Sequence, residues 1–203
     1  MCRKVIPMTL LLVQMLIITS CATTTFLKSW RDTNYHGQVK KVFVVSVDKD
    51  PGRRSLIENE FVRQFKARGT DAVASAEFMS GIEDPKRDVF ESKAREQGSD
   101  VILVAKFIRK ETEDTYTPQG DSGDQIIFSA ENDAIVQFPD NEEPERSYIY
   151  TISVMQLTLY DTETKKPIWS SRTRTKYQGS RTRQIKPFVD SVLRKLAGEK
   201  LIH

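Results

Sequence analysis

Two segments that are almost continuously apolar constrain the fold most. Residues 42–47 read Val-Phe-Val-Val-Ser-Val, and residues 101–105 read Val-Ile-Leu-Val-Ala. An unbroken apolar run of this length, rich in β-branched side chains, is typical of a strand that is buried on both faces of its sheet. Other elements must therefore cover both sides of that sheet, which favours an α/β fold.

The segments between these strands have the spacing of amphipathic helices. A first helix is expected over about residues 53–68, ended by a glycine cap, and a short strand over 70–75 follows it. A second helix is expected to begin at Asp84-Pro85, with the aspartate as N-cap, and to stop at Gly98. The order strand, helix, strand, helix, strand favours parallel strands joined by right-handed crossovers.

The second half of the chain has the pattern of a hairpin followed by a helix. A long β-rich segment over residues 147–160 precedes a polar turn over 161–166 and a return strand that ends near Tyr177. The last helix is expected to begin near Lys186, because Pro187 fits only in a first helical turn.

The complete pattern predicts one α/β domain over residues 39–203. Its mixed sheet has about five strands, in the order βαβαβ and then a long β-hairpin, with three helices. A single core is feasible at about 180 residues. Residues 111–146 form a long polar insertion, rich in Gly and Pro, that is either a protruding hairpin or a mobile flap.

Cys21 ends a segment with the features of a secretory signal. A basic start is followed by an apolar run over residues 5–18, which is shorter than the roughly 20 residues that a membrane-spanning helix needs. Residues 18–21, Ile-Thr-Ser-Cys, resemble a bacterial lipobox, in which the cysteine is lipidated and becomes the new N-terminus. The alternative is an ordinary signal with a chance cysteine. We predict a lipoprotein signal peptide over 1–20 and a lipid-anchored tether and lead-in over 21–38.

The residue after Cys21 predicts the membrane. It is Ala22 rather than aspartate, and the sorting rule that the lipobox resemblance implies then favours the outer membrane, with the domain facing the periplasm. Two or more acyl chains hold a protein firmly on a membrane, at about 0.8 kcal/mol per buried CH₂. The expected partners are the membrane, through the lipid anchor, and either another envelope protein or an anionic lipid.

Cysteine content argues against disulfides and thiol catalysis, and the net charge is small. Cys2 would leave with the signal and Cys21 would be acylated, so the mature chain has no thiol for a disulfide or for thiol catalysis. The formal charge of +3 includes Arg3 and Lys4, so the chain from residue 21 carries about +1. This small charge carries no information about nucleic acid, and no nucleic-acid partner is expected.

Part of the chain resembles an uncharacterised family of bacterial envelope lipoproteins. The residues that carry this resemblance are Val-Lys-Lys-Val-Phe-Val-Val at 39–45, Arg53-Arg54, Glu58, Glu60-Phe61-Val62 and Gly69. Residues 159–169 are similar to a hairpin that recurs in periplasmic lipoproteins. The arrangement also resembles the compact α/β domain of lipoproteins that act in curli secretion and in activating peptidoglycan synthases, a likeness that implies a fold and no function.

No pattern in the sequence predicts a reaction. Neither His36 nor His203 has a cysteine or acidic partner at metal-ligand spacing, so we expect no metal site. Nucleophile-elbow, P-loop and dinucleotide-binding motifs are absent from the sequence. A pair of glycosidase-like carboxylates could lie among the many acidic residues, but nothing singles two out. We expect no catalysis and no cofactor.

Two charged patterns remain. Arg54 and Glu58 are four residues apart on the first predicted helix, which favours a surface ion pair over an anion site. Arg172, Arg174 and Lys176 alternate on the return strand and so share one face. These three cations either prevent edge-to-edge pairing of an exposed strand or contact an anionic partner.

The function that we predict is a lipid-anchored periplasmic interaction or structural module of the outer membrane. The alternative is a small-ligand-binding protein or enzyme that uses a cleft near residues 111–146. A deep apolar pocket with converging polar groups would favour this alternative, and a flat surface with an exposed aromatic patch would favour the module. Trp30 is expected to pack the lead-in against the domain, or else to be exposed as an anchor for a partner.

Overall fold

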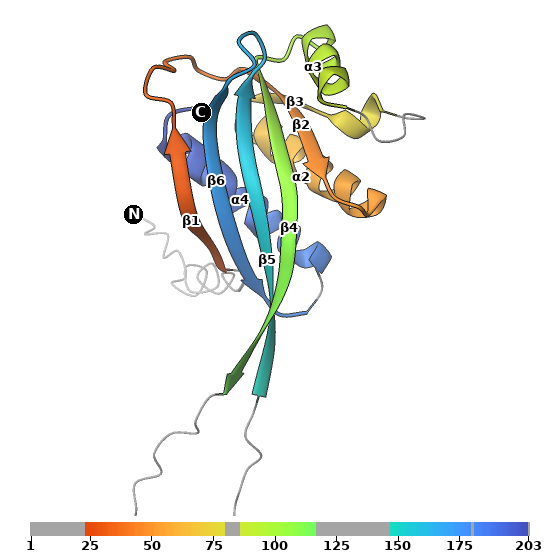
Figure 1. The fold of residues 1–203 in the computed structure, drawn as a ribbon, viewed down its shortest axis with the longest axis vertical. Coiled ribbons are helices and arrows are strands. Elements are labelled where there is room, and N and C mark those ends of the chain that lie inside the picture. The colour runs from red at the N-terminus through yellow and green to blue at the C-terminus, as the bar shows by residue number, and fades with distance from the viewer. Residues whose placement is uncertain (1–22, 80–85, 117–146, 180, 203) are drawn as a thin grey trace, which may run out of the picture.

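The described chain folds around one mixed sheet of six strands, in the order β1-β6-β5-β4-β2-β3 (Figure 1). The structure is a computed structural model that describes residues 23–79, 86–116, 147–179 and 181–202. Together with three α-helices in these residues, the sheet confirms the predicted α/β class. The elements are β1 (Thr23–Arg31), β2 (Lys41–Val47), α2 (Pro51–Ala67), β3 (Asp71–Ala74), the short 3₁₀ helix η1 (Ser75–Glu77), α3 (Arg87–Glu96), β4 (Val101–Tyr116), β5 (Ser147–Asp161), β6 (Pro167–Tyr177) and α4 (Arg181–Gly198).

The two halves of the sheet differ in strand direction, as the sequence predicts. Strand β2 pairs in parallel with both β3 and β4, which are reached through helical crossovers. Strands β4, β5, β6 and β1 pair antiparallel, and β5 and β6 form the predicted hairpin around residues 161–166. The apolar runs of β2 and β4 are buried except at Val47, which is 43% exposed, and Val104, which is partly buried, as expected for central strands covered on both sides.

Helices cover the two faces of the sheet unequally. Helices α2 and α4 pack on one face, here called the α2–α4 face, where Phe61 is fully buried and its ring meets Phe188 edge-on at 6.2 Å between centroids. On the opposite face, here called the α3 face, α3 and η1 pack around a smaller cluster that includes Phe43 of β2 and Ile102 of β4. Phe61 therefore belongs to the main core of the domain.

The predicted tether is wrong for residues 23–31. These residues form β1, an edge strand that is hydrogen-bonded to β6 from Thr23 to Arg31, and they raise the strand number from the predicted five to six. Threonine and aromatic side chains suit a strand, but most of β1 is exposed or only partly buried. Its polar composition therefore resembles that of a spacer.

Strand β4 extends beyond the predicted strand end and into the predicted insertion. It continues to Tyr116 opposite Ser147, with a register shift between Phe107 and Arg109, so residues 111–116 belong to the sheet. Figure 1 shows β4 and β5 running past the ends of the other strands as a two-stranded ribbon. The rest of the predicted insertion, residues 117–146, lies outside the described residues.

Two helix starts differ from the predictions. Helix α4 begins at Arg181, and Pro187 lies inside it rather than in its first turn. Near this proline, the Gln64 side-chain amide of α2 donates a hydrogen bond to the Lys186 carbonyl oxygen at 2.9 Å. Helix α3 begins at Arg87, whereas its predicted N-cap at Asp84-Pro85 lies outside the described residues.

Candidate functional site

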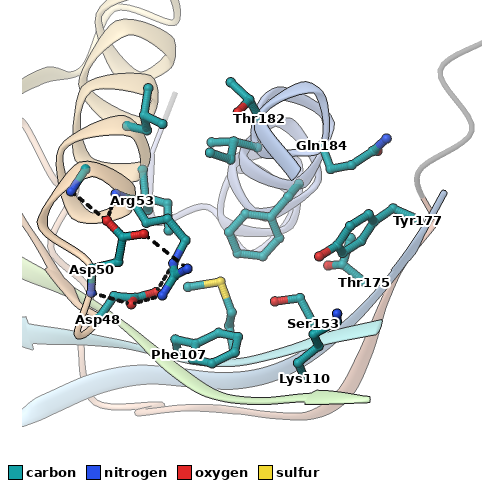
Figure 2. Close-up of a pocket in the computed structure, with 16 residues that line it drawn as sticks. Asp48, Asp50, Arg53, Phe107, Lys110, Ser153, Thr175, Tyr177, Thr182 and Gln184 are labelled. Atoms are coloured by element: carbon teal, nitrogen blue, oxygen red, sulfur yellow. Dashed lines mark hydrogen bonds and ion pairs between the residues drawn. The ribbon is translucent and has the colours of Figure 1, made fainter. Parts of the chain in front are cut away.

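A cavity of about 400 Å³ lies between the α2–α4 face of the sheet and the N-terminal ends of both helices (Figure 2). This volume is within the range of small-molecule sites. Most of its wall is hydrocarbon, contributed by Leu56, Ile57, Phe107, Met155, Ile185 and Phe188. Four separate segments of the chain supply this wall, so no local sequence motif could predict it.

One end of the cavity carries a closed cluster of charges. Asp50 caps α2 by accepting hydrogen bonds from the backbone amides of Gly52 at 2.9 Å and Arg53 at 3.2 Å. The Arg53 guanidinium donates to both carboxylate oxygens of Asp48, at 2.8 and 2.6 Å, and lies 3.2 Å from Asp50. The hydrogen bond to Asp48 raises the pKa of Arg53. This arginine is therefore already neutralised and is not a free anion site.

The other end of the cavity has hydroxyl groups and a lysine. Figure 2 shows Lys110, Ser153, Thr175 and Tyr177 there, away from the Asp48 and Arg53 cluster. Lys110 has no carboxylate partner within the described part of the chain. Chemically, the site therefore offers an apolar chamber with one available cation and several hydroxyls, and nothing in it resembles a nucleophile–base pair.

The predicted basic strip of Arg172, Arg174 and Lys176 does lie on one face, the α3 face, but two of its members are paired. Arg174 contacts Glu111 at 3.4 Å and Glu113 at 3.3 Å, and Lys176 contacts Glu113 at 2.8 Å. The Lys176 hydrogen bond lowers the pKa of Glu113, and a hydrogen bond from Arg109 is the largest cause of the lowered pKa of Glu111.

These ion pairs bridge β4 and β6 across β5. Beneath them, Ile152 and Val154 of β5 are fully buried, although no helix among the described residues covers this part of the sheet. Strand β6 is interior, between β1 and β5, so its cations do not protect a sheet edge. Only Arg172 of the three has no carboxylate partner in the described residues, and its guanidinium donates to the Gln156 side chain at 3.3 Å.

Trp30 does not pack the start of the chain against the core. Its side chain is 51% exposed on β1, and Leu27 on the same strand is 52% exposed. The expectation of a buried plug is therefore wrong, and the alternative of an exposed aromatic side chain describes its position. Strand β1 thus presents two large apolar side chains at the edge of the sheet.

Glu58 is a buried residue that the sequence interpretation missed. We expected a surface ion pair with Arg54, but Glu58 is fully buried and accepts hydrogen bonds from the Ser46 amide at 2.8 Å, the Ser75 hydroxyl at 2.9 Å and the Ala76 amide at 2.8 Å. Burial raises the pKa of this carboxyl. The available signal was its spacing, because Glu58 lies three residues before Phe61 and so falls on the apolar stripe of α2.

A smaller cavity of about 260 Å³ lies beneath α3. Its charged groups are occupied with one another, since Glu91 pairs with Arg87 at 2.6 Å and with Lys165 at 2.8 Å. The Arg87 guanidinium also lies over the Tyr160 ring, 5.2 Å from its centroid. This mutual pairing leaves a weaker case for a ligand here than in the larger cavity.

The remaining predicted sites are less informative. The predicted lipidation site, Cys21, and His203 lie outside the described residues, and His36 is exposed. Among the described residues, no group of three histidine, cysteine or acidic side chains could hold a metal ion. In that same part of the chain, no helix is long and apolar enough to cross a membrane.

Comparisons with known proteins leave the family open. No protein-family model matches the sequence, and no curated protein matches it. Similar solved structures include a dodecamer of PelC from Paraburkholderia phytofirmans, with 12% identity over 90% of this chain and 99% of that chain and a TM-score of 0.44. Lipoprotein GNA1162 from Neisseria meningitidis has 15% identity over 78% of this chain and 98% of that chain, with a TM-score of 0.43. A minor lipoprotein from Acinetobacter baumannii has 8% identity over 79% and 94% of the two chains, with a TM-score of 0.35. Likenesses at this level carry no inference about family, assembly or function.

Proposed function

We propose that this protein is a lipid-anchored module of the bacterial outer membrane that faces the periplasm and binds a partner without catalysis. The observation that carries this proposal is the position of β1. Its pairing with β6 begins at Thr23, so only Ala22 separates the sheet from Cys21. Lipid on Cys21 would therefore hold one end of the sheet close to the membrane rather than on a flexible linker.

The sheet register identifies which end that is. Thr23 is level with Lys176 of β6, Ile152 of β5 and Glu111 of β4. The β4–β5 ribbon continues five residues further, to Tyr116, which is about 16 Å at 3.3 Å per residue. An anchored domain would thus bring this ribbon to the membrane surface, together with side chains such as Ile149, which is 61% exposed.

The exposed edge of the sheet supports a protein partner as well. Leu27 and Trp30 give β1 an apolar edge, and aromatic side chains are enriched where proteins bind one another.

The anchor is tested by replacing the proposed lipidation site. Cys21→Ala should lose lipid and move from the membrane pellet to the soluble fraction after a high-salt wash, because the acyl chains supply the attachment. Cys2→Ala is the matched control and should still pellet. Salt-resistant pelleting of Cys21→Ala, with Cys2→Ala unchanged, would show that lipid on this cysteine is not what holds the protein.

The larger cavity favours a second candidate function, the binding of a small ligand near the start of the predicted insertion. Lys110 lines it and directly precedes residues 111–146. The volume, the hydrocarbon wall and the few polar groups at its ends are those of a ligand site.

A further inference from the structure

The larger cavity has a polarity that selects one kind of ligand. Its central wall is hydrocarbon, and its two ends differ in charge. At one end Asp48 and Asp50 both pair with Arg53, so the cation there is already occupied. At the other end Lys110 has no acidic partner among the described residues, and its neighbour Glu111 pairs with Arg109 and Arg174 on the α3 face.

We propose that this cavity binds a single-chain anionic amphiphile, with its hydrocarbon tail between α2 and α4 and its anionic head at Lys110. The hydroxyls of Ser153, Thr175 and Tyr177 lie at the same end and can donate hydrogen bonds to an anionic head. The opposite orientation would place the head beside Arg53, whose guanidinium is already paired with Asp48 and Asp50.

The position of the cavity identifies the source of this amphiphile as the membrane. Lys110, Ser153, Thr175 and Thr24 form one row across β4, β5, β6 and β1. Three strand spacings of about 4.8 Å place the Lys110 backbone roughly 14 Å from that of Thr24. Thr24 follows Cys21 by three residues, so the head-binding end lies at the proposed anchored end of the domain. The inference that the amphiphile comes from the membrane rests on the proposed function. The inference that the cavity binds an anionic amphiphile does not.

The experiment measures binding to the chain from residue 21 to 203 with Cys21→Ser, which is the proposed mature protein without its lipid. A cooperative thermal melt first establishes that this form is folded. Titration calorimetry then compares octanoate, decanoate and dodecanoate, each below its micelle concentration. We expect one saturable site whose affinity rises by up to about fourfold per added CH₂ and levels off when the cavity is full.

Four variants separate the tail site from the head site. Two variants fill the cavity: Ser153→Phe from the sheet and Leu56→Trp from the exposed rim of α2. Each should abolish binding of dodecanoate and of dodecanol. Lys110→Met should weaken dodecanoate by about fivefold, the size expected for an exposed ion pair, and leave dodecanol unchanged. Lys106→Met, on the α3 face of the same strand, is the matched control and should bind as the parent does.

Three results would overturn the proposal. The first is the absence of saturable binding by the folded parent. The second is dodecanoate binding by both cavity-filling variants that is as tight as binding by the parent. The third is an equal change in dodecanoate affinity in Lys110→Met and Lys106→Met. A fourth comparison uses the lipidated protein in nanodiscs. If the unlipidated protein binds dodecanoate and the lipidated protein does not, the occupant is the protein's own acyl chain, and the proposal of a free amphiphile is refuted. Because the calorimetry uses protein without lipid, its failure is distinguishable from failure of the anchor proposal.

Discussion

The buried carboxylate of Glu58 gives the sharpest test of the fold. It joins the end of β2, helix α2 and η1 by accepting from the amides of Ser46 and Ala76 and from the Ser75 hydroxyl. Glu58→Ala removes the acceptors of all three hydrogen bonds and leaves two backbone donors without a protein partner. At about 1–3 kcal/mol for each unsatisfied buried donor, the free energy of unfolding should fall by about 2–6 kcal/mol.

Glu58→Gln should be milder, because one side-chain oxygen accepts from both Ser46 and Ser75 and an amide oxygen can replace it. The second oxygen accepts from Ala76, where an amide NH₂ group would meet another donor. We expect a loss of about 1–3 kcal/mol. Chemical denaturation followed by circular dichroism gives the unfolding free energies, and Asn59→Ala on the exposed side of α2 is the control.

The pH dependence has a definite sign. Burial raises the pKa of Glu58 above its ordinary value of 4.5, so the folded state keeps this proton to higher pH than the unfolded chain does. The contribution of Glu58 to the unfolding free energy is therefore complete below pH 4.5 and falls as the pH rises through the raised pKa. Carboxylates with lowered pKa values, such as Glu60, act in the opposite sense, so the readout is the difference between wild type and Glu58→Gln. This difference should be largest below pH 4.5. A difference that stays constant with pH, or a Glu58→Ala protein as stable as Asn59→Ala, would refute the reasoning.

Two further outcomes follow from the packing and the ion pairs. Phe61→Ala should cost about 3–5 kcal/mol, because the ring is fully buried against Phe188; a thermal melt equal to that of wild type would contradict this packing. A second variant replaces Arg172, Arg174 and Lys176 together with glutamine. Cosedimentation of the unlipidated variant with anionic vesicles should equal that of the parent at every salt concentration, because two of the three cations already pair with Glu111 and Glu113. A salt-sensitive loss of binding would instead show that these cations contact an anionic surface.

Strong local patterns predicted the central sheet well. The apolar runs at 42–47 and 101–105 could only be strands covered on both faces, and the polar turn at 161–166 predicted the β5–β6 hairpin. Strand β1 could not be predicted in this way. Its residues are threonine-rich and half-exposed, and they are a strand because β6 supplies hydrogen-bond partners.

The larger cavity could not be predicted from the sequence for a related reason. The larger cavity is formed by α2, α4, β4, β5 and β6 together, and the direction in which Lys110 points depends on the register shift between Phe107 and Arg109. Glu58 was misassigned because an i,i+4 charge pattern suggests a surface pair, whereas its spacing from Phe61 places it on the buried stripe.

The pairing of β1 with β6 has a consequence for the order of events in biogenesis. The Thr24 and Thr175 hydroxyls that meet across these strands, 3.1 Å apart, are separated by 151 residues of sequence. Contacts between such distant residues form slowly, because a long loop must close first. Strand β1 therefore cannot pair until β6 has been synthesised. If Cys21 is processed as proposed, this delay gives the modifying enzymes time to act before the neighbouring strand β1 joins the sheet.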